Sequence, residues 1–292
     1  MSILWGLAAA FTLGVADFAA REAGQREGSL TTLLYVQLIG SPITFIWIFL
    51  STDIPFSNLT SLATILGVVS GFQLIIGNLL FYQALIIGPL LIVAPITSSF
   101  AIVTILLSLL TGERPTPLQM TGIVITLTGI ILAAAAGTDF FRFSGIENTR
   151  NNKTWRSSGI LLAIMAAILF GISFWLMKYA VLSLGSQLTV FVTRQTALVV
   201  MVIIFLVTKR SPYLLSYDSL RWIGTIAILD TGASWFINLG LQSGFASIVS
   251  VITSLYSVVT ITLGYLLLRE RITRSQQIGI GFTLAGVVLS SM

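Results

Sequence analysis

"IVAPITSSFAIVTILLSLL" (Ile92–Leu110) decides the fold, because a close copy, "IVSVITSLYSVVTITLGYL" (Ile248–Leu266), follows it 156 residues later. Just beyond these stretches, the offset between the two copies increases by one residue, and Glu113-Arg114 aligns with Glu270-Arg271. Because the matches keep the same order and nearly the same spacing, we infer that the chain is an internal duplication.

The correspondence extends to both ends of each half. Upstream, "GVADFAARE" (Gly14–Glu22) lies over "GISFWLMKY" (Gly171–Tyr179). Downstream, two glycines seven residues apart recur in the second half, so that the matched pairs are Gly122 with Gly279 and Gly129 with Gly286. Glycines at this spacing give a helix a smooth face, which suits tight helix packing or a homodimer contact.

The composition indicates a membrane protein. The 292 residues are 56% hydrophobic and 9% charged, whereas soluble domains have about 25% charged residues. The mean hydropathy is +1.00. Runs of about 20 apolar residues match the roughly 30 Å hydrocarbon core of a bilayer. We predict ten such helices, at 3–20, 30–50, 62–86, 90–111, 117–136, 158–181, 187–207, 219–242, 246–268 and 275–291.

The predicted fold is an all-α membrane protein of ten transmembrane helices, arranged as two inverted five-helix repeats. The first repeat covers 1–137, a polar linker covers 138–157, and the second repeat covers 158–292. An odd number of spans per repeat makes the second copy enter the membrane upside down. Transporters that work by alternating access use this architecture, with the substrate site at mid-depth between the repeats.

The absence of Cys and His excludes several chemistries. It removes disulfides, thiolate nucleophiles, imidazole bases and the usual zinc sites, and the sequence has no phosphate-binding loop of ATP-driven motors. We therefore expect no cofactor, no metal and no enzyme. "LDTGAS" (Leu229–Ser234) has the Asp-Thr-Gly signature of aspartic peptidases, but that chemistry needs a second carboxylate, and the equivalent position in the other half is Gln73.

Lys and Arg are retained on the cytoplasmic side of a membrane, so their distribution predicts the orientation in a plasma (bacterial inner) membrane. One face holds only Arg114 and Lys178, whereas the loops after odd-numbered helices hold Arg21, Arg26, Arg142, Arg150, Lys153, Arg156, Lys209, Arg210, Arg221, Arg269, Arg271 and Arg274. The odd-numbered loops are therefore predicted to be cytoplasmic and both termini external. The net charge of +5 belongs to these loops and does not indicate a nucleic-acid partner.

Five stretches together resemble the EamA-type transporters of the drug/metabolite transporter superfamily. They are the two Glu-Arg boundaries, "GNLLFYQALIIGPLLIVAPITSSF" (Gly77–Phe100), "FGISFWLMKYA" (Phe170–Ala180) and "FVTRQTALVV" (Phe191–Val200). The resemblance covers nearly the whole chain. It implies a carrier of small organic solutes, with a central cavity lined by helices 3, 4, 8 and 9 and parts of 1, 2, 6 and 7.

The sequence differs from this family in one residue of helix 2 and in the membrane orientation that its charges predict. The basic residue typical of helix 2 is present in the second half as Arg194, but Gln37 replaces it in the first. The resemblance also implies cytoplasmic termini, against the charge count, which we follow because it belongs to this sequence.

Asp230 and Arg194 are the strongest candidates for a substrate site. An ionisable group within a membrane helix marks a pathway or relay by default, and Arg194 could pair with Asp230 or hold a substrate carboxylate. A structural role for each is the alternative. Asp17 and Arg21, four residues apart, are interpreted as a pair at the interface. Other polar and aromatic groups predicted to bind substrate are Gln73, Asn78, Tyr82, Thr97, Ser98, Trp175, Trp235, Asn238, Thr253, Ser254 and Tyr256.

These features favour a secondary active transporter that exports an amino acid or related metabolite, with coupled protons and a homodimer as open additions. The alternatives are a membrane interaction protein that does not transport, and an intramembrane aspartyl peptidase. The small polar residues of helices 4 and 9 could equally serve close helix packing.

Overall fold

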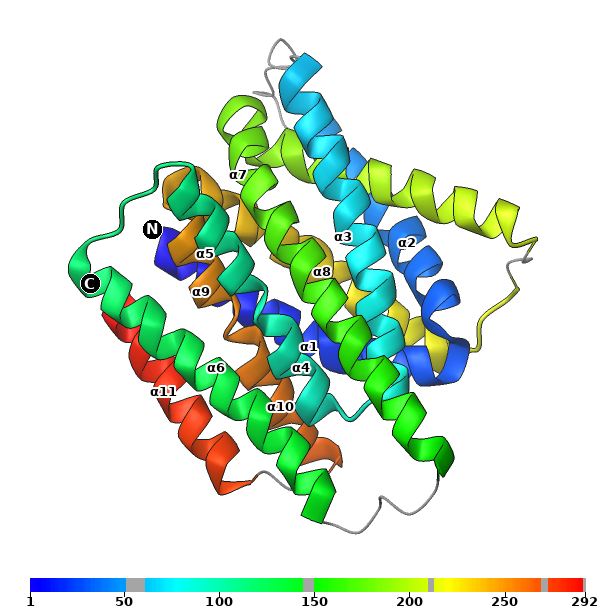
Figure 1. The fold of residues 1–292 in the computed structure, drawn as a ribbon. Helices are drawn as coiled ribbons and strands as arrows, with labels where there is room; N and C mark the ends of the chain where they lie inside the picture. Colours follow the sequence, from blue (N-terminus) through cyan, green and yellow to red (C-terminus); the bar gives the residue numbers. More distant parts are fainter. Residues whose placement is uncertain (51–60, 144–149, 210–212, 269–272, 291–292) are drawn as a thin grey trace.

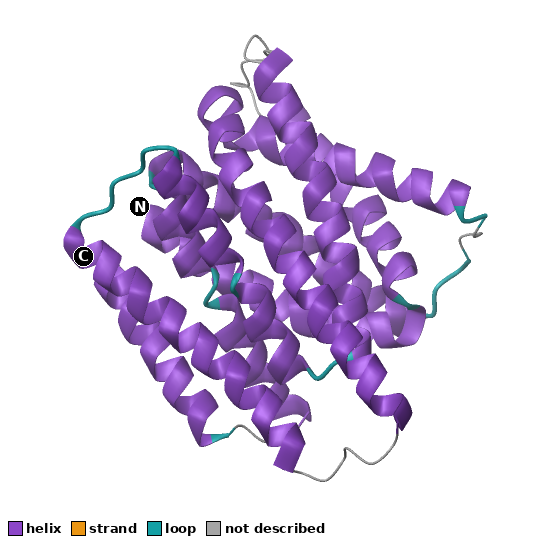
Figure 2. Ribbon diagram, in the orientation of Figure 1, coloured by secondary structure: helices purple, strands orange, loops and turns teal. Residues whose placement is uncertain are grey.

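The computed structural model describes residues 1–50, 61–143, 150–209, 213–268 and 273–290, with the backbone alone described at 61, 134–143, 150–158 and 268. In these ranges the chain is helical, without strands (Figures 1 and 2). The elements in order are α1 (Ser2–Glu27), α2 (Ser29–Leu50), α3 (Ser61–Ile87), α4 (Leu90–Ser98), α5 (Phe100–Leu110), α6 (Pro117–Phe143), α7 (Arg150–Val207), α8 (Tyr217–Ser243), α9 (Ala246–Thr253), α10 (Tyr256–Leu268) and α11 (Arg274–Ser290).

Six helical stretches among the described residues are long and apolar enough to cross a membrane, by length and composition. The longest, Gly159–Val207, has 49 residues, more than twice the about 20 that a bilayer needs. Gly185 divides it, with φ of 80° and ψ of 166°, a conformation that glycine adopts without steric cost. The two arms of α7 run in different directions (Figure 1) and occupy the two predicted spans 158–181 and 187–207.

Helix extends into both ends of the predicted polar linker at 138–157. α6 runs on to Phe143, and α7 starts at Arg150. Of the repeated charged pairs, Glu113-Arg114 lies in the described chain, whereas Glu270 and Arg271 lie outside the described residues.

Two predicted spans, 90–111 and 246–268, are each broken near the middle into a pair of shorter helices. Pro95 is not the cause, because the second span lacks a proline and breaks at the equivalent place. Both breaks follow the shared Ile-Thr-Ser sequence, where hydroxyls of Ser98 and Ser254 donate to the carbonyls of Pro95 and Val251, at 2.9 and 2.6 Å. Such bonds to carbonyls three residues back compete with the helical ladder and bend it.

The two halves repeat one helix crossing. In the first, a Cβ added to Gly14 on α1 would lie 2.8 Å from the carbonyl oxygen of Tyr256 on α10; in the second, a Cβ on Gly171 of α7 would lie 2.7 Å from that of Phe100 on α5. A threonine hydroxyl bridges each crossing, donating to Gly14 O over 3.2 Å and to Gly171 O over 3.0 Å. Small residues permit this approach of membrane helices.

α6 and α11 lie side by side along one edge of the molecule (Figure 1). A Cβ on Gly122 would lie 2.6 Å from Gly286 O, and one on Gly286 would lie 2.6 Å from Gly122 O. Gly129 and Gly279 face each other in the same way, at 2.5 and 2.7 Å. The smooth faces predicted from glycine spacing therefore pack against each other within the chain.

Candidate functional site

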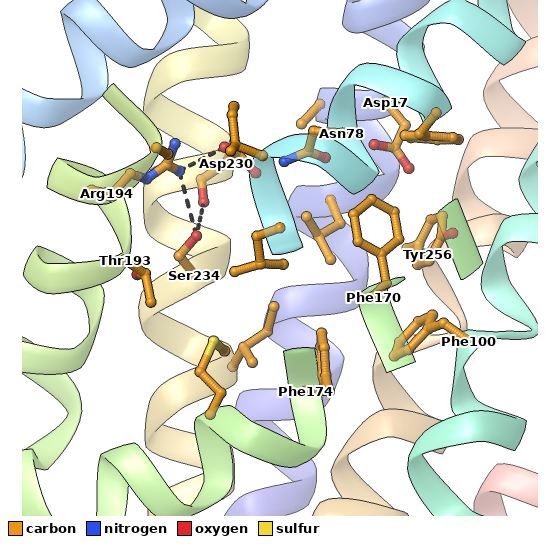
Figure 3. A pocket seen from close by; sticks show the side chains of 18 of the residues that line it. Asp17, Asn78, Phe100, Phe170, Phe174, Thr193, Arg194, Asp230, Ser234 and Tyr256 are labelled. Carbon is orange, nitrogen blue, oxygen red and sulfur yellow. Dashed lines mark hydrogen bonds and ion pairs between the residues drawn. The ribbon is translucent and has the colours of Figure 1, made fainter. Parts of the chain in front are cut away.

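A cavity lies between the two halves of the chain (Figure 3). The cavity has a volume of about 100 Å³. Because one water molecule needs about 10–15 Å³ by the same measure, there is room for a small solute. Its walls come from α1, α2, α3, α5, both arms of α7, α8 and α10, within the spans that the family resemblance named. The lining residues include Asp17, Gln37, Asn78, Phe81, Tyr82, Phe100, Phe170, Phe174, Thr193, Arg194, Asp230, Ser234, Asn238 and Tyr256.

An ion pair closes one end of the cavity. The guanidinium of Arg194, on the second arm of α7, donates from Nη2 to Asp230 Oδ2 on α8 over 2.6 Å. Its Nη1 donates to Gln37 Oε1 over 3.2 Å, and Nη2 also reaches Ser234 Oγ at 3.4 Å. A charge removed from water is costly unless it is paired and hydrogen-bonded. These partners explain how Arg194 stays buried at 5% exposure.

Asp17 lies at the other end of the cavity from Arg194, near Phe170 and Tyr256 (Figure 3). The sequence suggested an interfacial partner for Arg21, but this carboxylate lines the cavity and is only 8% exposed. Within the described residues it accepts no hydrogen bond and makes no ion pair. A carboxylate is therefore available to a bound solute.

Two more polar groups in the cavity wall lack partners in the described chain. Asn238 is 1% exposed; its Nδ2 donates to Ser234 O over 2.7 Å, but its Oδ1 is buried and unpaired. The hydroxyl of Tyr256, 4% exposed, is also buried without a partner. Buried polar atoms normally have a hydrogen-bond partner, so these two are candidates for contact with a ligand.

Aromatic rings form much of the remaining wall. Phe100 stacks on Tyr256, with centroids 6.4 Å apart and an interplanar angle of 20°, and it also meets Phe174 at 4.7 Å. Phe81 and Phe170 meet edge to face at 6.2 Å. The cavity thus has a polar end at the ion pair and an aromatic region around Asp17.

Of the residues predicted to bind substrate, the structure brings six together in this cavity: Asn78, Tyr82, Arg194, Asp230, Asn238 and Tyr256. The predicted pairing of Arg194 with Asp230 is confirmed. The aromatic wall residues were missed, although Phe100 is the repeat mate of Tyr256 and could have been selected with it. Asp17 was set aside because its helix position placed it near an interface.

The other predicted residues lie elsewhere. Thr97 donates to Val93 O over 2.8 Å, and Ser98 and Ser254 likewise bond within their own helices, so these hydroxyls shape helix breaks. The oxygens Thr253 Oγ1 and Gln73 Oε1 are buried without partners in the described chain, outside the cavity lining.

The two predicted tryptophans also lie outside the cavity. Trp175 donates from Nε1 to Thr111 Oγ1 over 3.1 Å. Trp235 meets Trp47 edge to face at 4.2 Å and lines a separate, smaller hollow. Both side chains are partly exposed and have aromatic or hydrogen-bonding partners in the protein, as Trp side chains commonly do.

The repeated Glu-Arg boundary has a structural role that the sequence did not indicate. Glu113, after α5, caps α9: its Oε1 accepts from Ala246 N over 2.7 Å, and its Oε2 accepts from Ser247 N over 3.1 Å and from Ser247 Oγ over 2.7 Å. A carboxylate at this position satisfies free N–H groups and complements the helix dipole. Nearby, Lys178 donates to the last carbonyls around α8, including Leu241 O at 2.6 Å. Glu113 thus joins the two halves away from the cavity.

The sequence model of the EamA-like transporter family matches residues 1–135 and again 157–292. The chain belongs to the EamA-like transporter family. Proteins of this family are transporters and not enzymes, which removes the peptidase alternative. The geometry agrees, because the Asp230 carboxylate is held by a guanidinium instead of sharing a proton with a second acid.

Similar proteins match one half or the whole of this transporter. "Uncharacterized protein MJ1333.1" of Methanocaldococcus jannaschii is 32% identical over 132 residues, which are 45% of this chain and 94% of that relative. A protein about as long as one half therefore exists on its own. A solved structure titled "Crystal structure of protein" covers 99% of this chain and 96% of its own, with a TM-score of 0.70 and 15% identity; at that identity the likeness concerns the fold.

Proposed function

We propose that this protein is a secondary active transporter that moves a small organic metabolite, an amino acid or a related solute, by alternating access between two inverted repeats. The observation that carries the proposal is the cavity itself. It is buried between the halves, takes walls from both, and holds charged groups that no apolar core requires. Transporters of inverted-repeat architecture bind substrate at such an interface.

Reciprocal contacts support the two-fold relation of the repeats. Gly122 faces Gly286 while their repeat mates, Gly279 and Gly129, face each other. When one residue contacts a second, and the repeat mates of these two residues also contact each other, the two copies are related by a two-fold axis. Two pairs of repeat mates also touch directly: Arg194 bonds Gln37, and Phe100 stacks on Tyr256. Residues related by an axis meet each other only where the axis passes.

We propose 1–137 and 158–292 as the repeats, with ten spans in a plasma membrane and the odd-numbered loops cytoplasmic. Support comes from the charge distribution along the chain and from the division of α7 at Gly185. A reporter fused to the C-terminus tests the orientation, since alkaline phosphatase is active only outside the cytoplasm. Export, proton coupling and a homodimer remain predictions to be tested beside it.

Counterflow in proteoliposomes tests transport. Vesicles are loaded with one unlabelled amino acid, and entry of the same labelled solute is followed for each candidate. We expect exchange for at least one solute and a loss of about tenfold or more in Asp230→Asn, because the ion pair at the cavity is broken. Asp218→Asn is the matched control, an exposed carboxylate in the first turn of the same helix, and it should exchange at the wild-type rate.

The second candidate function is a membrane interaction protein without transport. Absence of exchange for every small metabolite, in protein that still melts cooperatively, would favour it. Equal loss in Asp230→Asn and Asp218→Asn would also count against a role for the cavity.

A further inference from the structure

The formal charges around the cavity do not balance. Its lining contains two carboxyl groups, those of Asp17 and Asp230, and one guanidinium, that of Arg194. Arg194 and Asp230 neutralise each other at 2.6 Å. Asp17 stands apart from that pair (Figure 3) and has no ion pair among the described residues. The cavity therefore presents one carboxyl group that has no ion-pair partner among the described residues.

Several oxygens in the cavity wall also lack partners in the described chain. They are those of the Asp17 carboxyl group, Asn238 Oδ1 and the Tyr256 hydroxyl, and an amide carbonyl oxygen can only accept a hydrogen bond. The donors at the opposite end are engaged, because the Arg194 guanidinium already bonds Asp230, Gln37 and Ser234. A solute bearing N–H donors would satisfy these oxygens, whereas a carboxylate could pair with Arg194 only by displacing Asp230.

The walls beside Asp17 suit the remainder of such a solute. Phe100, Phe170 and Tyr256 surround this end of the cavity (Figure 3). Aromatic faces attract a positive charge through their quadrupole, most strongly where water is excluded, and they accept a flat apolar body by stacking.

From the carboxyl group without a partner, the unpaired oxygens and the aromatic wall, we propose that the substrate is an organic cation: an amine with an apolar or aromatic body and no carboxylate. Its ammonium binds Asp17, its remaining N–H groups reach the unpaired oxygens, and its body packs on the rings. This inference rests on the proposed transport function, and it assigns the substrate to amines without a carboxylate in place of amino acids.

Three probes that share one ring separate the possibilities: phenethylamine, phenylalanine and phenylacetate. Each is tested by thermal shift on the purified full chain and as a competitor of counterflow. A ligand that prefers the folded state raises its apparent stability. We expect phenethylamine to give the largest shift, phenylalanine a smaller one and phenylacetate none. A larger shift with either carboxylate probe, or none with the amine, overturns the assignment.

Variants locate the binding group. Asp17→Asn should weaken phenethylamine binding by about tenfold or more, whereas Asp17→Glu, which keeps the charge, should retain most of it even if Asp17→Asn folds poorly. Glu22→Gln on the same helix, outside the cavity lining, is the matched control and should bind as wild type. Unchanged binding in Asp17→Asn refutes the role of this carboxylate. Exchange of an amino acid without amine binding would leave the transport function standing and remove only the cation proposal.

Discussion

The helix crossings and the cavity between them differ in how faithfully the two halves repeat. The crossing of α1 with α10 and that of α7 with α5 use the same glycine and the same threonine bond. The cavity lies among the same helices, yet its chemistry is not repeated: the mate of Arg194 is Gln37, and the mate of Asp17 is Phe174.

Physical constraints explain this difference. At a crossing, a glycine lies against the backbone of its neighbour, so a side chain has no space to enter, and both copies keep the same residue. A cavity wall faces open volume, where side chains of different size and charge can be accommodated. Duplication therefore supplied the scaffold twice, whereas each charged group of the cavity has an uncharged repeat mate, which makes the site asymmetric.

The largest effect is expected where the scaffold is tightest. In Gly129→Val, the new side chain would meet Gly279 O, since even a Cβ would lie 2.5 Å from it. Overpacking of this kind costs about 3 kcal/mol or more when backbone must move, so little folded protein should elute in fluorescence-detected gel filtration. Gly281→Val on α11, where nothing lies within 4 Å, should elute normally. A normal profile for Gly129→Val would show that this packing is dispensable.

The next effect tests the asymmetric ion pair. Arg194→Gln leaves Asp230 unpaired, and because that side chain is 20% exposed we expect a loss of about 2–3 kcal/mol, below the range for a fully buried pair. Adding Asp230→Gln makes the second half resemble the first, which carries Gln37 and Gln73. The double variant should regain most of the melting temperature but not transport. If it is no more stable than the single variant, uncompensated charge is not the cause.

A smaller effect is expected at the cap that links the halves. Glu113→Gln replaces a charged acceptor of the α9 N–H groups by an amide and should cost about 1–2 kcal/mol in thermal melting. Arg114→Gln, at the neighbouring exposed position, provides the control and should melt with the wild type. Identical melting of both variants would contradict the capping role.

The smallest effect measures how well the crossings match. Thr104→Val and Thr260→Val each remove one hydroxyl that bonds across a crossing. Each should lower the stability by about 1 kcal/mol, with equal losses for the two halves in denaturant titrations. A large inequality between them would mean that only one crossing depends on its threonine bond.

Much of the fold could be predicted because it is local. Most predicted apolar runs end within a few residues of the helices found, although α1, α6 and α7 extend further, and the glycine pairs pack as their spacing suggested. The helix break at Ser254 could not be predicted, because its only signal in the sequence is a set of hydroxyl residues that also occur in unbroken helices. The candidate site was predicted in part: Asp230 and Arg194 stood out as charges in apolar helices, whereas Phe100 and Phe174 looked like any other core residue.

The sequence by itself determined the internal repeat, the positions of the apolar helices and the isolated charges, because each of these is written along the chain as identity, hydropathy or residue type. Only the tertiary structure decided that Asp17 faces a cavity, that Arg194 is already neutralised, and that Glu113 caps α9. Helices that are apolar on all sides give no signal of which face turns inward. Their rotation is set by contacts between glycines and neighbouring backbones, which exist only once the helices have packed.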